Sequence, residues 1–261
     1  MSTKNIIIFG QTGAGKSSVV NLMTGTQTAK TSIGIQRCTL HWEEYSIGLD
    51  GHSLRVFDTI GLEEPQLGIT EYLNIVQNSY NLITKLRQEG GIDLLLFCVR
   101  AGRFSSTTPS NYQIFYEHLC EKKVPIILVL TGLEREPKMD DWWTKSKHVF
   151  DKHGVFVDDH ACITAINGAE WRNNYEESQR LVRDLVLKHC FPNGRRGFNG
   201  GGGWFGRFMN KLKVFLKNSK TPNKKDVVKV LTQRCGVPRE VAVEMAEEIK
   251  AKTGLLNIFI P

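Results

Sequence analysis

The segment GQTGAGKS, from Gly10 to Ser17, carries glycines, a lysine and a serine at the spacing GxxxxGK[S/T]. A turn built on such glycines points several backbone N–H groups at one phosphate, and the helix that follows adds the positive end of its dipole. Lys16 would reach the terminal phosphates of a nucleoside triphosphate, and the Ser17 hydroxyl would bind Mg²⁺. A chance match in a glycine-rich turn is the alternative. The predicted phosphate contacts are Thr12, Gly13, Ala14, Gly15, Lys16, Ser17 and Ser18.

A second motif, DTIG, runs from Asp58 to Gly61 at the end of a predicted strand. The aspartate can hold Mg²⁺ through a water molecule, and the Gly61 N–H can meet the γ-phosphate. Between the two motifs lies a polar stretch, and Thr39 near its end could complete the metal coordination or be an ordinary strand threonine. Thr31 and Ser32 compete for the same role. The predicted metal ligands are Ser17, Thr39 and Asp58.

A third motif, TGLE, follows the apolar run Ile126–Leu130 and ends in Glu134. A carboxylate at this place accepts hydrogen bonds from N1–H and the exocyclic amine of guanine, a pair of donors that adenine lacks. Thr164 and Ala165 come at the end of the last predicted strand and would present a backbone N–H to the guanine O6. The predicted base contacts are Thr131, Glu134, Thr164 and Ala165.

The elements that position these motifs alternate along the chain almost to residue 190. Apolar runs predict six strands, at Asn5–Phe9, Thr39–Ile47, Ser53–Asp58, Leu94–Val99, Ile126–Leu130 and Ala161–Thr164. Amphipathic patterns predict helices at Lys16–Met23, Glu71–Glu89, Asn111–Glu121, Asp140–Phe150 and Glu176–His189. Asp50-Gly51 predicts a hairpin between the second and third strands. The order indicates an α/β fold with a mostly parallel six-stranded sheet and helices on both faces.

Composition divides the chain into a body at 1–191, a glycine-rich linker at 192–203 and a helical extension at 204–261. No run approaches the roughly 20 apolar residues of a membrane-spanning helix, and the N-terminus does not resemble a signal peptide. The six cysteines are scattered without a CxxC pair. We therefore expect free thiols, several of them buried, in a cytoplasmic protein.

The net charge of +7 comes from one segment, because ten Lys or Arg residues and no acidic residue lie between Leu185 and Lys225. Trp204–Lys220 has the pattern of a basic amphipathic helix, with two shorter helices predicted beyond it at Lys225–Arg234 and Pro238–Lys252. The basic segment 195–225 could bind an anionic membrane surface, peripherally, or RNA. The alternative is that its apolar stripe packs on the helices that follow.

Together the motifs resemble those of P-loop GTPases of the septin, AIG1 (GIMAP) and chloroplast-import-receptor group, over roughly Lys4–His189. The strings CTLHW, FCVRAGR and VLTGLERE resemble uncharacterised fungal G-domain proteins most closely. The resemblance implies GTP or GDP with Mg²⁺ as ligands. GTP-binding domains carry NKxD where this chain has TGLE; AIG1-type members have a T-x-x-E variant that TGLE fits. TGLE keeps the carboxylate and lacks the lysine whose stem covers the purine ring.

Leu62 stands where many small GTPases have the glutamine that orients the attacking water. We therefore expect slow hydrolysis, or a missing group supplied by a partner or by a second copy in a homodimer. Arg100 and Arg103 are candidates for that group, and solvent-facing ion pairs are the alternative for both. A switch with slow hydrolysis is the main prediction. A nucleotide-bound scaffold without turnover and an ATPase are the alternatives.

Overall fold

The computed structural model describes residues 3–26, 42–59, 69–105, 107–191 and 197–200, together with single residues between 225 and 246. For residues 69–77 it describes the backbone alone. Within these parts of the chain, no helix is both long and apolar enough to cross a membrane. Four of the cysteines, Cys98, Cys120, Cys162 and Cys190, are buried free thiols, as predicted.

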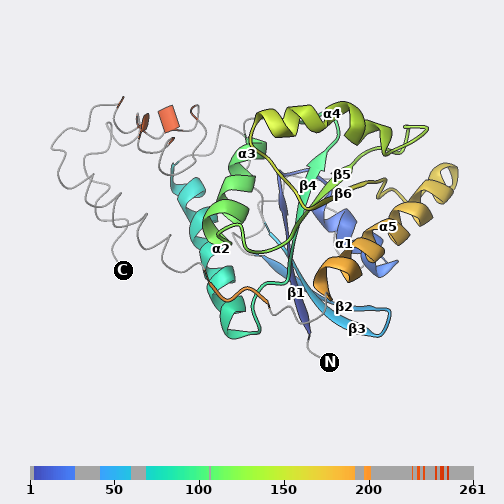
Figure 1. Ribbon diagram of the computed structural model, residues 1–261, viewed down its shortest axis with the longest axis horizontal. Helices are drawn as coiled ribbons and strands as arrows, with labels where there is room; N and C mark the ends of the chain where they lie inside the picture. The colour runs from blue at the N-terminus through green and yellow to red at the C-terminus, as the bar shows by residue number, and fades with distance from the viewer. Residues whose placement is uncertain are drawn as a thin grey trace.

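A six-stranded sheet forms the centre of the protein, with the strand order β2-β3-β1-β4-β5-β6 (Figure 1). The β2–β3 pair is antiparallel and every other pair is parallel, which confirms the predicted mostly parallel α/β sheet. The inner strands are apolar on both faces, as expected for a sheet covered by helices on both sides. The strands are β1 (Lys4–Gly10), β2 (Glu43–Leu49), β3 (His52–Asp58), β4 (Leu94–Arg100), β5 (Ile126–Thr131) and β6 (Asp159–Cys162).

Two apolar clusters cover the two faces of the sheet, because side chains alternate along each strand. Ile6 and Ile8 of β1 pack with α1 and α5, whereas Ile7 and Phe9 pack on the face of α2, α3 and α4. The Phe9 ring stacks on Phe97 at a centroid distance of 4.8 Å. The helices are α1 (Lys16–Thr24), α2 (Ile69–Gln88), α3 (Thr107–Tyr112), the π-helix η1 (Gln113–Leu119), α4 (Asp141–Lys152), the 3-10 helix η2 (Ala169–Trp171) and α5 (Arg172–Cys190).

The helix predicted at Asn111–Glu121 begins earlier, at Thr107. The Ser105 hydroxyl accepts a hydrogen bond from the Thr107 N–H, and the Thr108 hydroxyl accepts one from the Ser105 N–H. This reciprocal pairing resembles a helix cap. Pro109 is tolerated because the first turn of a helix leaves its N–H groups without helical partners.

The hairpin between β2 and β3 confirms the prediction from Asp50-Gly51, since both residues adopt left-handed conformations with φ of 47° and 81°. Such a turn fixes the register of the two strands. The second strand therefore ends at Leu49, which pairs with His52. The structure has the strand at Glu43–Leu49 where the sequence predicted Thr39–Ile47, and Thr39 lies outside the described residues.

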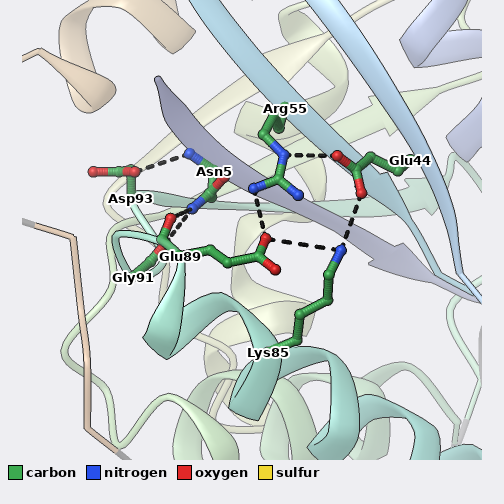
Figure 2. Close-up of polar contacts among 7 residues, drawn as sticks. All are labelled: Asn5, Glu44, Arg55, Lys85, Glu89, Gly91 and Asp93. Carbon is green, nitrogen blue, oxygen red and sulfur yellow. Dashed lines mark hydrogen bonds and ion pairs between the residues drawn. The ribbon is translucent and has the colours of Figure 1, made fainter. Parts of the chain in front are cut away.

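A polar network fastens the C-terminal end of α2 to the sheet (Figure 2). Arg55 of β3 bridges Glu44 of β2 at 2.6 Å and Glu89 at 2.7 Å, and Lys85 of α2 lies 3.2 Å from Glu44. The Asn5 side-chain amide donates to the Glu89 carbonyl at 3.0 Å. The hydrogen bond from Arg55 is the main reason that the pKa of Glu44 lies below its usual value. The network joins β1, β2 and β3 to the helix that follows the DTIG motif.

Part of the predicted linker is held against the body, because Phe198 and Ile92 exchange two backbone hydrogen bonds of 2.8 and 3.1 Å. The predicted helix Trp204–Lys220 lies outside the described residues. Among the described residues of the extension, Ala242 and Ala246 are buried in the cluster that covers the α2 face, with Val228 packed against it.

Candidate nucleotide-binding site

The predicted motifs meet at one edge of the sheet, where β1, β3, β4, β5 and β6 all have their C-terminal ends (Figure 1). Parallel strands place their carboxyl ends together, and ligands of open α/β sheets bind at that edge. Gly10 ends β1, Asp58 ends β3 and Thr131 ends β5. The topology thus brings together residues that lie more than a hundred positions apart in the sequence.

The loop after β1 begins with a backbone approach that admits no side chain. A Cβ on Gly10 would lie 2.1 Å from the carbonyl oxygen of Cys98 in β4, and the φ of Gly10 is +144°. Gly13 and Gly15 also have positive φ, of 75° and 85°, and Gly15 leads directly into α1. The loop therefore turns sharply around the point at which the α1 backbone N–H groups emerge.

Lys16 lies over this loop, because its ammonium donates to the carbonyls of Gly10 at 3.1 Å and Gln11 at 3.0 Å. Both contacts are to neutral acceptors within the loop itself. Hydrogen bonds between an ammonium and an anionic oxygen are stronger than those to neutral carbonyls. A phosphate in the loop would accordingly compete well for the ammonium.

Ser17 and Asp58, two of the three predicted metal ligands, are in direct contact. The Ser17 hydroxyl donates to the Asp58 carboxylate at 2.6 Å. Burial raises the pKa of Asp58, while the charge of Lys16 and the bond from Ser17 act in the opposite direction. A hydroxyl and a carboxylate side by side are the oxygen ligands that Mg²⁺ prefers. The third predicted ligand, Thr39, and the predicted phosphate contact Gly61 lie outside the described residues.

Gln11 is a residue of this site that the sequence pattern did not single out. Its side-chain amide donates to the hydroxyls of Ser105 at 2.6 Å and Thr108 at 2.9 Å, and it also contacts the Thr107 hydroxyl. These contacts tie the phosphate loop to the start of α3. The motif GxxxxGK[S/T] allows any residue at this position. The role of Gln11 is therefore seen only in the structure, from its contacts with the three hydroxyls.

Thr131, the first residue of TGLE, supports the same loop from β5. Its hydroxyl donates to the Ala14 carbonyl at 2.8 Å, and its side chain is almost fully buried. The loop is thereby held by two strands, β4 and β5, which lie on the same side of β1 in the sheet. Thr131 thus contributes to the site by holding the loop, a role distinct from the base contact predicted for it.

The second residue of TGLE, Gly132, lies beside a side chain from β4. A Cβ on Gly132 would lie 3.4 Å from the Cγ, Nε and Cζ atoms of Arg100. Arg100 pairs with Thr131 in the sheet register, so its side chain runs across the neighbouring loop. Arg103 follows on the same segment, with its Nη1 atom 3.7 Å from the place that a Cβ on Gly13 would occupy.

Glu134 lies beside an open pocket of about 720 Å³ that is lined by Glu134, Arg135, Glu136, Pro137, Glu170, Trp171 and Asn174. Within the described part of the chain, the buried Oε2 atom of Glu134 has no hydrogen-bond partner. A buried carboxylate oxygen without a donor is costly unless a ligand supplies one. This observation makes Glu134 the strongest candidate for a ligand contact at this end of the site.

Thr164 and Ala165 lie next to this loop, since the Leu133 N–H donates to the Ile163 carbonyl at 3.3 Å. The Thr164 N–H is already engaged by the Ser178 hydroxyl at 3.0 Å, and the Thr164 hydroxyl accepts from the Ile166 N–H. These two hydrogen bonds hold the turn, and the nucleotide contact predicted for Thr164 stays a prediction. Ala165, which is half-buried, remains the candidate for the predicted backbone contact to a base.

Part of the chain is similar to known GTPases. Residues 5–132, a little under half of the chain, match the model of a family described as 50S ribosome-binding GTPases. A translocase of chloroplast 34 homolog from Chlamydomonas reinhardtii is 29% identical over 103 residues, which cover 36% of this chain and 25% of that protein.

Two solved structures share the fold. A variant of Era from Aquifex aeolicus, bound to GDP and AlF₄⁻, has a TM-score of 0.53 and 20% identity, over 76% of this chain and 62% of that one. Toc33 from Arabidopsis thaliana, in complex with GDP and Mg²⁺, has a TM-score of 0.52 and 16% identity, over 76% and 88% of the two chains. The chain thus spans less than two thirds of Era and a quarter of the translocase homolog.

The role of Thr131 can be tested by removing its hydroxyl at nearly constant volume. We expect Thr131→Val to lower the free energy of unfolding by about 1–3 kcal/mol, because the buried Ala14 carbonyl loses its donor. Affinity for nucleoside triphosphates should fall as well, since the loop loses a support. Thr131→Ser keeps the hydroxyl and serves as the control. Urea unfolding and nucleotide titration of both variants are the measurements, and equal results for valine and serine would contradict the role.

Proposed function

We propose that this protein, which has the P-loop GTPase fold, is a guanine-nucleotide-binding switch that binds Mg²⁺–GTP and hydrolyses it slowly to GDP. The observation that carries the proposal is the buried Oε2 atom of Glu134, at the end of the site opposite Lys16, which has no donor among the described residues. A single ligand that reaches both ends needs phosphates for Lys16 and a pair of N–H donors for Glu134. Guanine nucleotides have both.

At the phosphate end, the protein contributes charge and oxygen ligands. The ammonium of Lys16 would exchange the carbonyls of Gly10 and Gln11 for oxygens of the β- and γ-phosphates. Ser17 and Asp58, which are in direct contact, would hold the metal ion. When bound, Mg²⁺ would neutralise the negative charge that develops on the phosphate oxygens. The Toc33 structure in complex with GDP and Mg²⁺ supports this assignment by its shared fold.

At the base end, Arg100 takes the place of the lysine that TGLE lacks. The arginine side chain lies against Gly132, which is the position of that lysine in the tetrad. A guanidinium plane stacks on aromatic rings, and the aliphatic stem covers apolar surface. Arg100 would therefore cover the purine ring from β4, while Glu134 reads its edge. A side chain that covers the ring contacts adenine and guanine alike. Selectivity for guanine would therefore depend on Glu134.

Hydrolysis is proposed to depend on assembly, since Leu62 offers no group to orient water. Arg103 is the candidate to supply positive charge to the γ-phosphate, because it already lies beside Gly13 in the phosphate loop. It would act within its own protomer or across a homodimer formed through the GTPase domain. A nucleotide-bound scaffold without turnover, and less favourably an ATPase, are the alternative functions.

The basic segment 195–225 is proposed to bind an anionic surface, either a membrane, to which the cytoplasmic protein would attach peripherally, or RNA. The nine Lys or Arg residues of this segment, which has no acidic residue, support this proposal. Packing of the apolar stripe within the extension is the competing arrangement.

Base selectivity tests the proposed function directly. Wild-type protein should bind Mg²⁺–GTP more tightly than Mg²⁺–ATP. Glu134→Gln should weaken GTP binding by about 10-fold or more, because each hydrogen bond to a carboxylate contributes about 1.5–3 kcal/mol. ATP binding should change little. Glu136→Gln, in the same pocket wall, is the matched control. Titration with labelled nucleotides is the measurement, and equal affinity of wild type for GTP and ATP would exclude guanine recognition.

Arg100→Ala should weaken GTP and ATP binding to a similar extent, by about 3- to 30-fold, which corresponds to a cation–π contact of about 0.5–2 kcal/mol. Arg100→Lys should restore part of the affinity, because a lysine stem can also cover the ring. Arg172→Ala, at an exposed position outside the pocket, is the control. Unchanged nucleotide affinity in Arg100→Ala would assign the arginine to packing alone.

Dependence on assembly predicts that turnover per molecule rises with protein concentration between the nanomolar and tens-of-micromolar range. Arg103→Ala should abolish the rise and leave GTP affinity within about threefold of wild type, since the arginine would act mainly in the transition state. Phosphate release at several protein concentrations measures both. A fast rate that does not depend on concentration contradicts the proposal, and no turnover at any concentration favours the scaffold.

A further inference from the structure

A second group of ligand-type side chains lies on the outer edge of the sheet, at β6. Asp140, His160 and Cys162 each offer one donor atom, and these atoms all lie within 4.8 Å of one another. His160 and Cys162 are two residues apart on the strand, so their side chains project from the same face. Asp140 directly precedes α4, which packs at this edge. None of the three was predicted to contact a nucleotide.

The side chains of this group are held in position by their neighbours. The Nε2 atom of His160 lies 2.9 Å from Oδ1 of Asp140. The imidazole ring also stacks on the indole of Trp143, with centroids 4.8 Å apart and an angle of 24° between the planes. Cys162 is only 2% exposed, whereas Asp140 opens to solvent. The group therefore combines an ordered imidazole and a buried thiol with an exposed carboxylate, through which a cation could enter from solvent.

The thiol is the least expected member. Burial raises the pKa of Cys162 to about 12, and the charge of Asp140 acts in the same direction, while the Trp143 backbone N–H acts against it. The free thiol is therefore protonated at neutral pH. A divalent metal ion stabilises the thiolate, and the displaced proton passes to solvent.

Sulfur, nitrogen and oxygen donors in one place suit a borderline-soft cation of low coordination number. In a tetrahedral zinc site the metal–ligand distances are about 2.0–2.3 Å, so that neighbouring ligand atoms lie about 3.3–3.7 Å apart. The donors here lie 2.9 Å apart for the histidine–aspartate pair and within 4.8 Å for the set. Changes of about 0.4 Å in the histidine–aspartate separation, and of up to about 1.1 Å in the widest separation of the set, would bring the donors to that spacing.

We propose that Asp140, His160 and Cys162 form a zinc-binding site, with a water molecule as the fourth ligand. The ion would join the N-terminal end of α4 to β6. These two elements flank the loop that carries Glu134 and the turn at Thr164 and Ala165. Zinc binding would therefore stabilise the part of the sheet edge that forms the predicted base pocket. The site itself is independent of the proposed nucleotide function.

Cobalt(II) is a suitable probe, because it replaces zinc in such sites and reports a thiolate ligand by absorption. The full-length protein, reduced and stripped with a chelator, is titrated with Co²⁺ in the absence of nucleotide. We expect one equivalent to bind with a thiolate-to-cobalt charge-transfer band and the visible bands of a tetrahedral ion. Zn²⁺ should displace the cobalt and raise the melting temperature. Titration without a charge-transfer band would overturn the proposal.

Variants separate this site from other metal sites of the chain. Cys162→Ser should abolish the charge-transfer band, whereas Cys190→Ser, at an equally buried free thiol, should keep it.

Asp140→Asn and His160→Gln keep the thiol and test the other two ligands. His160→Gln should lower Zn²⁺ affinity more than about 100-fold, because loss of an outer-sphere partner alone costs about 10- to 100-fold. A band that persists in Cys162→Ser, or Zn²⁺ affinity unchanged in folded His160→Gln, would show that the three residues form a hydrogen-bonded group only. Ser17→Ala should leave the band unchanged, which excludes the Mg²⁺ site as its source.

Discussion

The close approach of the phosphate loop to β4 and β5 is the constraint on which the site depends. Gly10 lies so near the Cys98 carbonyl that no side chain fits between them, and the Thr131 hydroxyl holds the Ala14 carbonyl from the other strand. Gln11 adds contacts to the start of α3. A loop of glycines would otherwise have high conformational freedom, and these contacts reduce the entropy that a ligand must overcome.

The two ends of the candidate site are built in different ways. The phosphate end uses consecutive residues of one loop and a helix N-terminus, with Asp58 as the main contribution from elsewhere. The base end uses single side chains from separate strands, with Arg100 from β4 lying against Gly132 and Glu134 following β5. Arg100 from the neighbouring strand lies against the glycine that stands in place of the tetrad lysine, which is why we propose that it covers the base.

The outer edge of the sheet carries a group with different chemistry. Edge strands have one side without strand partners, so their contacts depend on helices and side chains. At β6 the imidazole of His160 stacks on Trp143 of α4, and the thiol of Cys162 lies within 4.8 Å of the imidazole donor atom. A metal ion there would fasten the edge from which the base-end turns leave the sheet. Stability of the edge and order in the base pocket would then be linked physically.

The sequence by itself determined the fold class, the phosphate loop and the pairing of β2 with β3. Each is encoded in neighbouring residues, through apolar runs, glycine spacing and the Asp50-Gly51 turn. It did not reveal the role of Gln11, the position of Arg100 against Gly132, or the convergence of Asp140 with His160 and Cys162. These contacts join residues that are distant in the chain or occupy positions that a motif leaves undefined. Only the parallel sheet, which brings the strand ends together, decides which side chains meet.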